Sequence, residues 1–132
     1  MKKIFPYIVI LTLAVSTLAC SFSVNAPEIS TGEIQTFTVN EAVPASTEDV
    51  TVAIEMGAGR LNVSSGAQSL VEGTITYNVF GWEPEIAREN NRVRIHQGSL
   101  DEIKIPNDNV VNDWDLNLGD TPIALEISAG AY

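Results

Sequence analysis

The sequence has a single cysteine, Cys20, and a single histidine, His96, among its 132 residues. One cysteine excludes any intrachain disulfide, and one of each is too few for a zinc site of the usual type. A histidine that acts as a general base also needs a nucleophile and an orienting partner, and no such set stands out around His96. We therefore interpret His96 as a side chain on a solvated strand face.

Basic residues are also scarce. Seven Lys and Arg stand against 17 Asp and Glu, which gives a formal net charge of −10 at pH 7. Such a surface repels phosphate groups, so no nucleic-acid partner is expected. No glycine-rich phosphate loop and no Ser-His-Asp pattern is visible. The sequence therefore predicts neither an enzyme nor a cofactor, and the acidic balance is compatible with solubility alone.

Helical periodicity is missing after Cys20, and an alternation of apolar and polar residues takes its place. The pattern is clearest in Val50–Val63, VTVAIEMGAGRLNV. Val52 and Ile54 fall on one face of a predicted strand, and Leu61 and Val63 resume that face after Gly57-Ala58-Gly59. Because glycine reaches backbone angles that other residues resist, this stretch predicts two strands joined by a tight turn, a hairpin.

The same alternation recurs along the chain between turn signals, and Glu89-Asn90-Asn91 is a hairpin turn signal because Asn tolerates the left-handed region. The segment Ile54–Gly59, IEMGAG, is echoed by Leu125–Gly130, LEISAG, which suggests that equivalent strands recur in stacked layers. These features predict an all-β single domain of stacked short strands, β-solenoid-like or sandwich-like. The other predicted strands are Ile34–Val39, Leu70–Phe80, Arg92–His96, Trp114–Leu118 and Ile123–Ile127.

The amino terminus begins with Met1-Lys2-Lys3 and continues with the uncharged, mostly apolar run Ile4–Ala19. This run is shorter than the roughly 20 residues that a membrane-spanning helix needs, and it is typical of a secretory signal. Its end, Ser16–Cys20 with the sequence STLAC, resembles the lipobox of bacterial lipoproteins. The resemblance implies cleavage before Cys20 and attachment of a diacylglyceryl group to its sulfur. The alternative is a plain signal peptide with an incidental cysteine.

The expected organisation is a lipoprotein signal peptide over residues 1–19, the lipid-anchor cysteine and a flexible tether over 20–33, and a β domain over 34–132. The tether assignment rests on a stretch, SFSVNAPEISTGE, that is rich in Ser, Pro, Gly and Asn and has no period. The protein is expected in the cell envelope, outside the cytoplasm and held to the membrane by its lipid.

Three residues are candidates for ligand binding: Trp82, Asp108 and Asp113. Trp82 lies in a Gly-Trp-Glu-Pro turn and is expected to be exposed, so it could stack on a sugar ring. Trp114 shares a face with Leu116 and is expected in the core. Asp108 and Asp113 belong to an Asx-rich stretch, 107–115, whose oxygens could hold calcium, although such loops often satisfy their own backbone. Because the EF-hand pattern is absent, no metal site is assigned.

The order of GAGRLNV, LVEGTITYNVFGWEP, RVRIHQG and NDWDLNLGDTPIALEISAGA resembles the amino-terminal toast-rack domain of bacterial envelope proteins, over about Val50–Ala131. Such domains are similar to adhesin-like β-solenoid repeats and to envelope stress-response proteins. The resemblance implies stacked β-strands and offers no catalytic residues to carry over. Family members usually continue past the second glycine turn, whereas this sequence stops at Tyr132, so a short protein and missing last layers are both open.

The function expected from the sequence is a structural, adhesive or sensing role in the envelope, with a glycan- or calcium-binding module as the alternative. The expected partners are the membrane, through the lipid anchor, and a protein or a second copy that pairs with an exposed strand edge.

Overall fold

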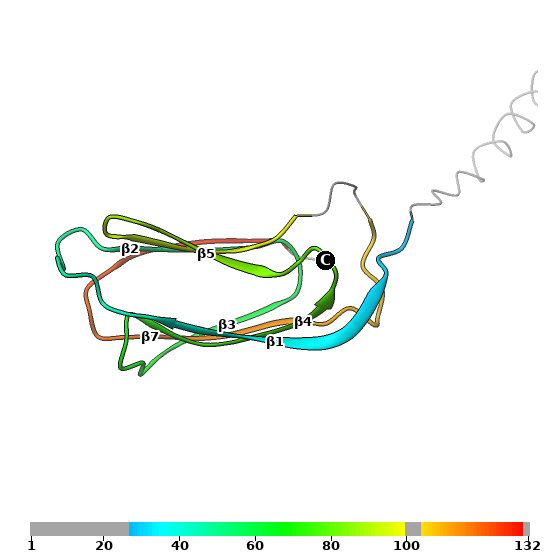
Figure 1. Cartoon of the computed structure of the whole chain (residues 1–132), viewed down its shortest axis with the longest axis horizontal. Coiled ribbons are helices and arrows are strands. Elements are labelled where there is room, and N and C mark those ends of the chain that lie inside the picture. The colour runs from blue at the N-terminus through cyan, green and yellow to red at the C-terminus, as the bar shows by residue number, and fades with distance from the viewer. Residues whose placement is uncertain (1–26, 100–103, 131–132) are drawn as a thin grey trace, which may run out of the picture.

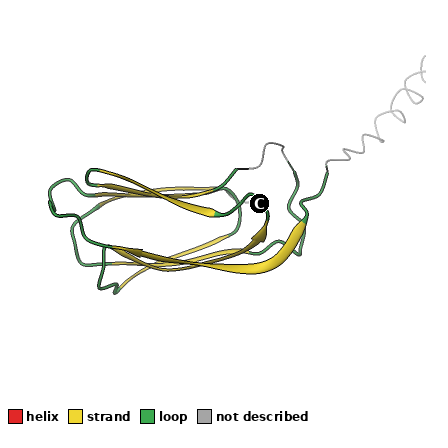
Figure 2. Ribbon diagram, viewed as in Figure 1, coloured by secondary structure: helices red, strands yellow, loops and turns green. Residues whose placement is uncertain are grey.

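The structure is a computed structural model that describes residues 27–99 and 104–130. Within these ranges the chain forms strands and no helix (Figures 1 and 2), which confirms the all-β fold class. It follows that this part of the chain offers no long apolar helix that could cross a membrane. The strands are β1 Thr31–Glu41, β2 Thr51–Met56, β3 Arg60–Ser65, β4 Val71–Val79, β5 Pro84–Glu89, β6 Arg92–Gln97, β7 Asn112–Leu118 and β8 Ala124–Ala129.

The strands form two four-stranded sheets that lie one above the other (Figure 1). The first sheet has the strand order β1-β4-β7-β3, and the second sheet has the strand order β5-β6-β2-β8. An ion pair between Glu41 in β1 and Arg88 in β5 joins one edge of each sheet. The edges β1 and β5 therefore lie on the same side of the sandwich, and the remaining edges, β3 and β8, lie together on the other side.

The core fills the space between the sheets because the alternating apolar residues of both sheets point inward. Val52 and Ile54 of β2, Ile75 of β4, Ile95 of β6 and Trp114 of β7 each have 0% exposure. They belong to one continuous apolar cluster with contributions from both sheets. The expectation that Trp114 is a core residue is confirmed.

The hairpin expected over Val50–Val63 is wrong, although both of its strands exist. β2 pairs in parallel with β6 and β8, whereas β3 pairs in parallel with β7 in the other sheet. The Gly57–Gly59 turn thus carries the chain from one sheet to the other. Alternation predicts only which face of each strand is buried, and that face is the same in a hairpin and in an arch that spans two sheets.

The turn signal at Glu89-Asn90-Asn91 is confirmed. β5 and β6 are antiparallel neighbours, with Glu89 opposite Arg92. Asn90 has a φ of 52°, in the left-handed region that Asn adopts more readily than most residues. The left-handed backbone at Asn90 therefore allows the tight connection in which Glu89 lies opposite Arg92.

The echo between the two glycine-turn segments corresponds to stacked neighbours, because β2 and β8 lie side by side and parallel. The register differs from the sequence match. Ile54 lies beside Ile127 instead of Leu125, and Met56 lies beside Ala129. A slip of two residues preserves the buried face of a strand, so the match in residue type survives the change of register.

The first strand begins at Thr31 instead of Ile34, where the alternation begins. Ile29, which precedes it, is only 4% exposed and packs with Val79 and Trp82 in a second apolar cluster. Residues 29–33, which the composition assigns to a tether, thus contribute to the fold. An isolated apolar residue has no periodicity, so the pattern could not reveal its burial.

Candidate functional site

The Gly57–Gly59 turn is held by a network of hydrogen bonds centred on Asn112, which is 1% exposed. The amide nitrogen of Asn112 donates to the carbonyl oxygen of Ala58 and, at 2.7 Å, to Oε1 of Gln97. Its Oδ1 accepts a hydrogen bond from Nε1 of Trp114 at 2.8 Å. The Gln97 Oε1 also accepts from the backbone N–H of Gly57 at 3.1 Å. One buried amide therefore ties the turn to both sheets.

The turn approaches β7 so closely that it requires glycine at position 59. Gly59 has a φ of 139°, and a Cβ there would lie 2.1 Å from the carbonyl oxygen of Asn112. Both the backbone angle and the space exclude a side chain. The turn is therefore packed directly against the backbone of β7 at Asn112.

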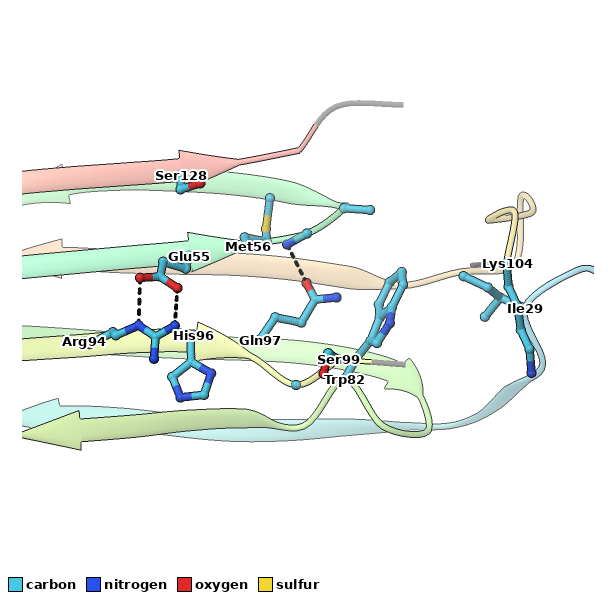
Figure 3. A pocket seen from close by; sticks show the side chains of 13 residues that line it. Ile29, Glu55, Met56, Trp82, Arg94, His96, Gln97, Ser99, Lys104 and Ser128 are labelled. Atoms are coloured by element: carbon cyan, nitrogen blue, oxygen red, sulfur yellow. Dashed lines mark hydrogen bonds and ion pairs between the residues drawn. The ribbon is translucent and has the colours of Figure 1, made fainter. Parts of the chain in front are cut away.

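A pocket of about 440 Å³ lies at this end of the second sheet (Figure 3). This volume falls in the range of small-ligand sites. Trp82 and Met56 supply apolar wall, and Gln97 and Ser128 supply polar groups. The titratable side chains that line it are Glu55, Arg94, His96 and Lys104.

The charges in the pocket are organised around a forked ion pair. Nε and Nη2 of Arg94 donate to the two carboxylate oxygens of Glu55, with a distance of 2.7 Å for Nε (Figure 3). The hydrogen bonds from Arg94 lower the pKa of Glu55 below its ordinary value of 4.5. Nε2 of His96 lies 3.6 Å from a carboxylate oxygen of Glu85 in the neighbouring strand. The outward position expected for His96 is confirmed, and Arg94 lies on the same face of β6.

Trp82 is buried, and the expectation of an exposed indole is wrong. Its exposure is 6%, because it packs with Ile29 and Val79 beyond the end of the second sheet. It nevertheless lines the pocket, as Figure 3 shows, so the indole remains a wall that a ligand could touch. The Gly-Trp-Glu-Pro sequence correctly indicated where β4 ends and the chain turns. It did not indicate that Ile29 and Val79 would pack on the indole of Trp82.

Asp108 and Asp113 do not come together as one site. Asp108 is exposed in the turn before β7. Asp113 lies on the outer face of β7 and its carboxylate is 3.8 Å from Nη1 of Arg60. Asp115, on the same face, accepts a hydrogen bond from Asn62 at 2.7 Å. Among residues 27–99 and 104–130, no group of three or more His, Cys, Asp or Glu side chains could hold a metal ion. The calcium alternative thus has no cluster of three carboxylates in this part of the chain.

The open side of the sandwich, formed by the edges β3 and β8, is a second candidate surface. Every residue of β8 is exposed, although Leu125 and Ile127 share the inward face of their buried neighbours Val52 and Ile54. Leu125 is 41% exposed and Ile127 is 50% exposed. The apolar side chains of β8 are therefore partly open to solvent on this side, whereas those of β2 beside them are fully buried.

The opposite side, formed by β1 and β5, is protected. Nε and Nη2 of Arg88 donate to both carboxylate oxygens of Glu41, whose side chain is only 4% exposed. β5 begins with Pro84, and the register of β1 shifts between Thr31 and Gln35. Proline, an irregularity and an inward-pointing charge are devices by which proteins keep sheet edges from pairing with other chains. The side formed by β1 and β5 thus carries features that hinder strand pairing, whereas β8 on the other side exposes apolar side chains.

Taken together, the fold is a two-sheet β-sandwich in which β2 and β3 are joined by a glycine turn, β2 pairs in parallel with β6 and β8, and β3 pairs in parallel with β7. The chain belongs to the family described as the N-terminal domain of toast_rack, DUF2154, whose model matches residues 26–132. No curated protein matches it.

A solved structure described as a "putative cell adhesion protein" from Clostridium sporogenes has the same fold, with a TM-score of 0.61 and 24% sequence identity. The match covers 74% of this chain and 47% of that one, so this chain spans about half the length of that structure. Cys20 lies outside the described residues.

Proposed function

We propose that the protein is a lipid-anchored component of the cell envelope with a structural or adhesive role. The observation that carries the role is the exposed edge pair β3 and β8. An unprotected edge with apolar residues beside it offers backbone hydrogen bonds and contact area to another polypeptide. The name of the similar solved structure, a "putative cell adhesion protein", agrees with this role.

The anchoring part of the proposal rests on Cys20 and the small residue before it, Ala19. Two acyl chains hold a protein at a membrane stably, since each buried methylene contributes about 0.8 kcal/mol. The test is metabolic labelling with a fatty acid, followed by membrane fractionation. The wild type should carry the label and sediment with membranes, and Cys20→Ala should lose both properties. Unchanged labelling of Cys20→Ala would refute the anchor.

The non-catalytic part is tested separately with the paired acids of β7. Purified protein should show no hydrolysis of wall glycans or glycosides above background. Hydrolysis that disappears in Asp113→Asn while the melting temperature stays unchanged would overturn this part of the proposal. Asp115→Asn, on the same outer face, is the matched control because it changes charge equally without touching the Arg60 ion pair.

The pocket beside Trp82 favours a second function, the binding of an acidic glycan. Arg94, His96 and Lys104 line the same pocket as Trp82 in a protein that is otherwise strongly acidic. Because Nε and Nη2 of Arg94 already donate to Glu55, a ligand carboxylate would compete with this side chain for the guanidinium group. Aromatic faces stack on sugar rings, and guanidinium groups bind carboxylates. Wall glycan fragments with acidic groups should raise the melting temperature of the wild type and have less effect on Arg94→Gln. Equal shifts in both proteins, or no shift, would exclude this site.

A further inference from the structure

We propose that the end of the sandwich next to residue 27 rests on the lipid bilayer, with the side chain of Phe80 inserted among the lipids at its surface. This inference rests on the proposed lipid anchor and deepens it, because it assigns the orientation in which the anchored domain stands on the membrane. The partner is the lipid surface itself.

Phe80 is the most exposed large apolar side chain in the described part of the chain. It is 87% exposed, whereas Val79 and Trp82, which flank it, are 2% and 6% exposed. The turn that ends β4 causes this contrast. The N–H of Trp82 donates to the carbonyl oxygen of Val79 at 3.2 Å, and both side chains pack in the second apolar cluster. The phenyl ring between them is therefore held outside the core by the fold.

Two isoleucines lie at the same end of the sandwich as Phe80. Ile105 is 50% exposed, and its backbone exchanges hydrogen bonds of 3.2 Å with Pro27 and 3.1 Å with Ile29. Ile34 is 64% exposed and lies in the irregular first part of β1, which pairs with the end of β4. Figure 1 shows the start of β1, the end of β4 and the loop after residue 104 at one end of the molecule. Exposed apolar groups that gather in one region mark an interaction surface.

The proposed anchor would hold this end of the domain near the membrane. Pro27 follows Cys20 by only seven residues. An extended chain spans at most about 3.6 Å per residue, so Pro27 would lie within about 25 Å of the acylated sulfur. β1 runs from this end over 11 residues, which is about 35 Å at roughly 3.3 Å per residue. Because the tether makes the lipid contact intramolecular, a weak apolar contact is enough to orient the domain.

The charges at this end favour an apolar contact over an electrostatic one. Glu28 and Glu33 are both exposed in the segment that enters the sandwich. Their carboxylates would be repelled by anionic headgroups, so attraction to such lipids cannot hold this end at the surface. Phe80 can insert at the boundary between headgroups and acyl chains, as apolar side chains of surface-bound proteins do. The contact should therefore persist at high salt, which screens only charges.

Strand pairing at the open side of the sandwich does not compete with this contact. β4, which ends next to Phe80, is separated from β3 by β7, and β1 lies on the other side of β4. A further strand beside β3 or β8, from this chain or from another, would extend the sheets on the side away from β1. The exposure of Phe80 thus follows from the turn after β4 and does not depend on what covers the open side.

The test uses the lipidated full chain in phosphatidylcholine vesicles. Because Cys20 is the only cysteine and its sulfur carries the proposed anchor, Phe80→Cys adds a single free thiol for an environment-sensitive fluorophore. Lipids that carry a spin label near the headgroup should quench this fluorophore at least about fivefold more strongly than one at Ser46→Cys. Ser46 is the matched control, because it is exposed in the loop after β1, at the opposite end.

A second pair of variants tests the side chain of Phe80 itself, because an apolar fluorophore can enter lipid by its own affinity. The reporter is now a fluorophore at Ile105→Cys. Phe80→Asp should reduce lipid quenching of this reporter by about half or more, since a carboxylate resists insertion. Val43→Asp adds the same charge at the far end, where Val43 is 39% exposed, and should leave the quenching unchanged. Both side chains lie outside the core, so both variants should keep the wild-type melting temperature.

The orientation is overturned by equal quenching at positions 46 and 80, by no quenching at 80, or by equal effects of the two Asp variants. A fluorophore at position 80 that neither spin-labelled lipid nor aqueous iodide can quench would indicate a polypeptide cover, which also overturns it. If the chain does not float with the vesicles, the proposed anchor fails and the orientation fails with it. If the chain floats but position 80 is not quenched, the anchor stands and only the orientation is wrong, so the two failures are distinguishable.

Discussion

The N–H of Gly130 donates to the carbonyl oxygen of Met56 at 2.9 Å, which continues the parallel pairing of β8 with β2 as far as the Gly57–Gly59 turn. The contact is so close that a Cβ at position 130 would lie 1.8 Å from the carbonyl oxygen of Gly57. Close pairing at this end of β8 thus depends on glycine at position 130.

Gly130→Ala should therefore separate the end of β8 from β2. We expect a loss of about 1–3 kcal/mol in the free energy of unfolding, the usual cost of forcing a methyl group into occupied space. Urea denaturation measures the loss, and hydrogen exchange should locate it in β8. Gly32→Ala is the control, because a Cβ there meets its nearest atom, the carbonyl oxygen of Asn78, at an ordinary 3.7 Å. Equal losses in both variants would contradict the stacking argument.

Asn112 is the residue whose replacement should loosen the glycine turn. Asn112→Ala removes the acceptor of the buried Trp114 N–H and the donor to Ala58, and an unsatisfied buried group costs about 1–3 kcal/mol. We expect a total loss of about 2–5 kcal/mol in the free energy of unfolding, measured with urea. Asn62→Ala, which removes an exposed hydrogen bond to Asp115, should cost less than about 1 kcal/mol. Comparable costs would mean that the buried network adds nothing.

Alternation in the sequence correctly predicted which residues face inward and which face outward. Trp114 is in the core, and Arg94 and His96 point outward, as a period of two requires. Strand pairing was not predictable in this way. The pattern that buries Ile54 and Val63 is the same whether their strands are neighbours in one sheet or face each other across two, and only the backbone path decides between them.

The candidate sites were predicted less well than the fold, for a related reason. Trp82 and Ile29 are far apart in the sequence but pack on each other in the fold. Neither residue lies in a segment with a regular apolar–polar alternation. The pocket also depends on long-range neighbours, since Glu55 and Arg94 come from adjacent strands of one sheet. The chemical character of Arg94 was visible in the sequence, but its partner was not.

Acid should destabilise the fold through glutamates whose pKa values are lowered in the folded state. Hydrogen bonds from Arg94 lower the pKa of Glu55 below 4.5, and those from Arg92 do the same for Glu126. The unfolded chain then binds more protons, so this contribution is complete above pH about 4.5 and is lost as the pH falls through the lower folded values. The melting temperature should fall in that range.

The ion pair itself can be tested as the cause of this pH dependence. Glu55→Gln and Arg94→Gln should each flatten the fall in melting temperature below pH about 4.5, and the double variant should flatten it no further than either single one. Additive effects of the two substitutions would show that the residues act independently.

Ile29 provides the sharpest test of where the folded domain begins. It lies before β1 and packs on Trp82 and Val79, so it should stabilise the fold although composition places it in a tether. Ile29→Ala should lower the free energy of unfolding by about 2–4 kcal/mol, the range for buried isoleucine. Ile34→Ala is the matched control, because that side chain is 64% exposed and its loss should change stability by about 0.5 kcal/mol or less. If both variants unfold at the wild-type urea concentration, residues 29–33 are not part of the folded unit. If only Ile29→Ala is destabilised, the pocket wall formed by Trp82 depends on this segment, and a shortened chain that lacks it should lose any ligand bound there.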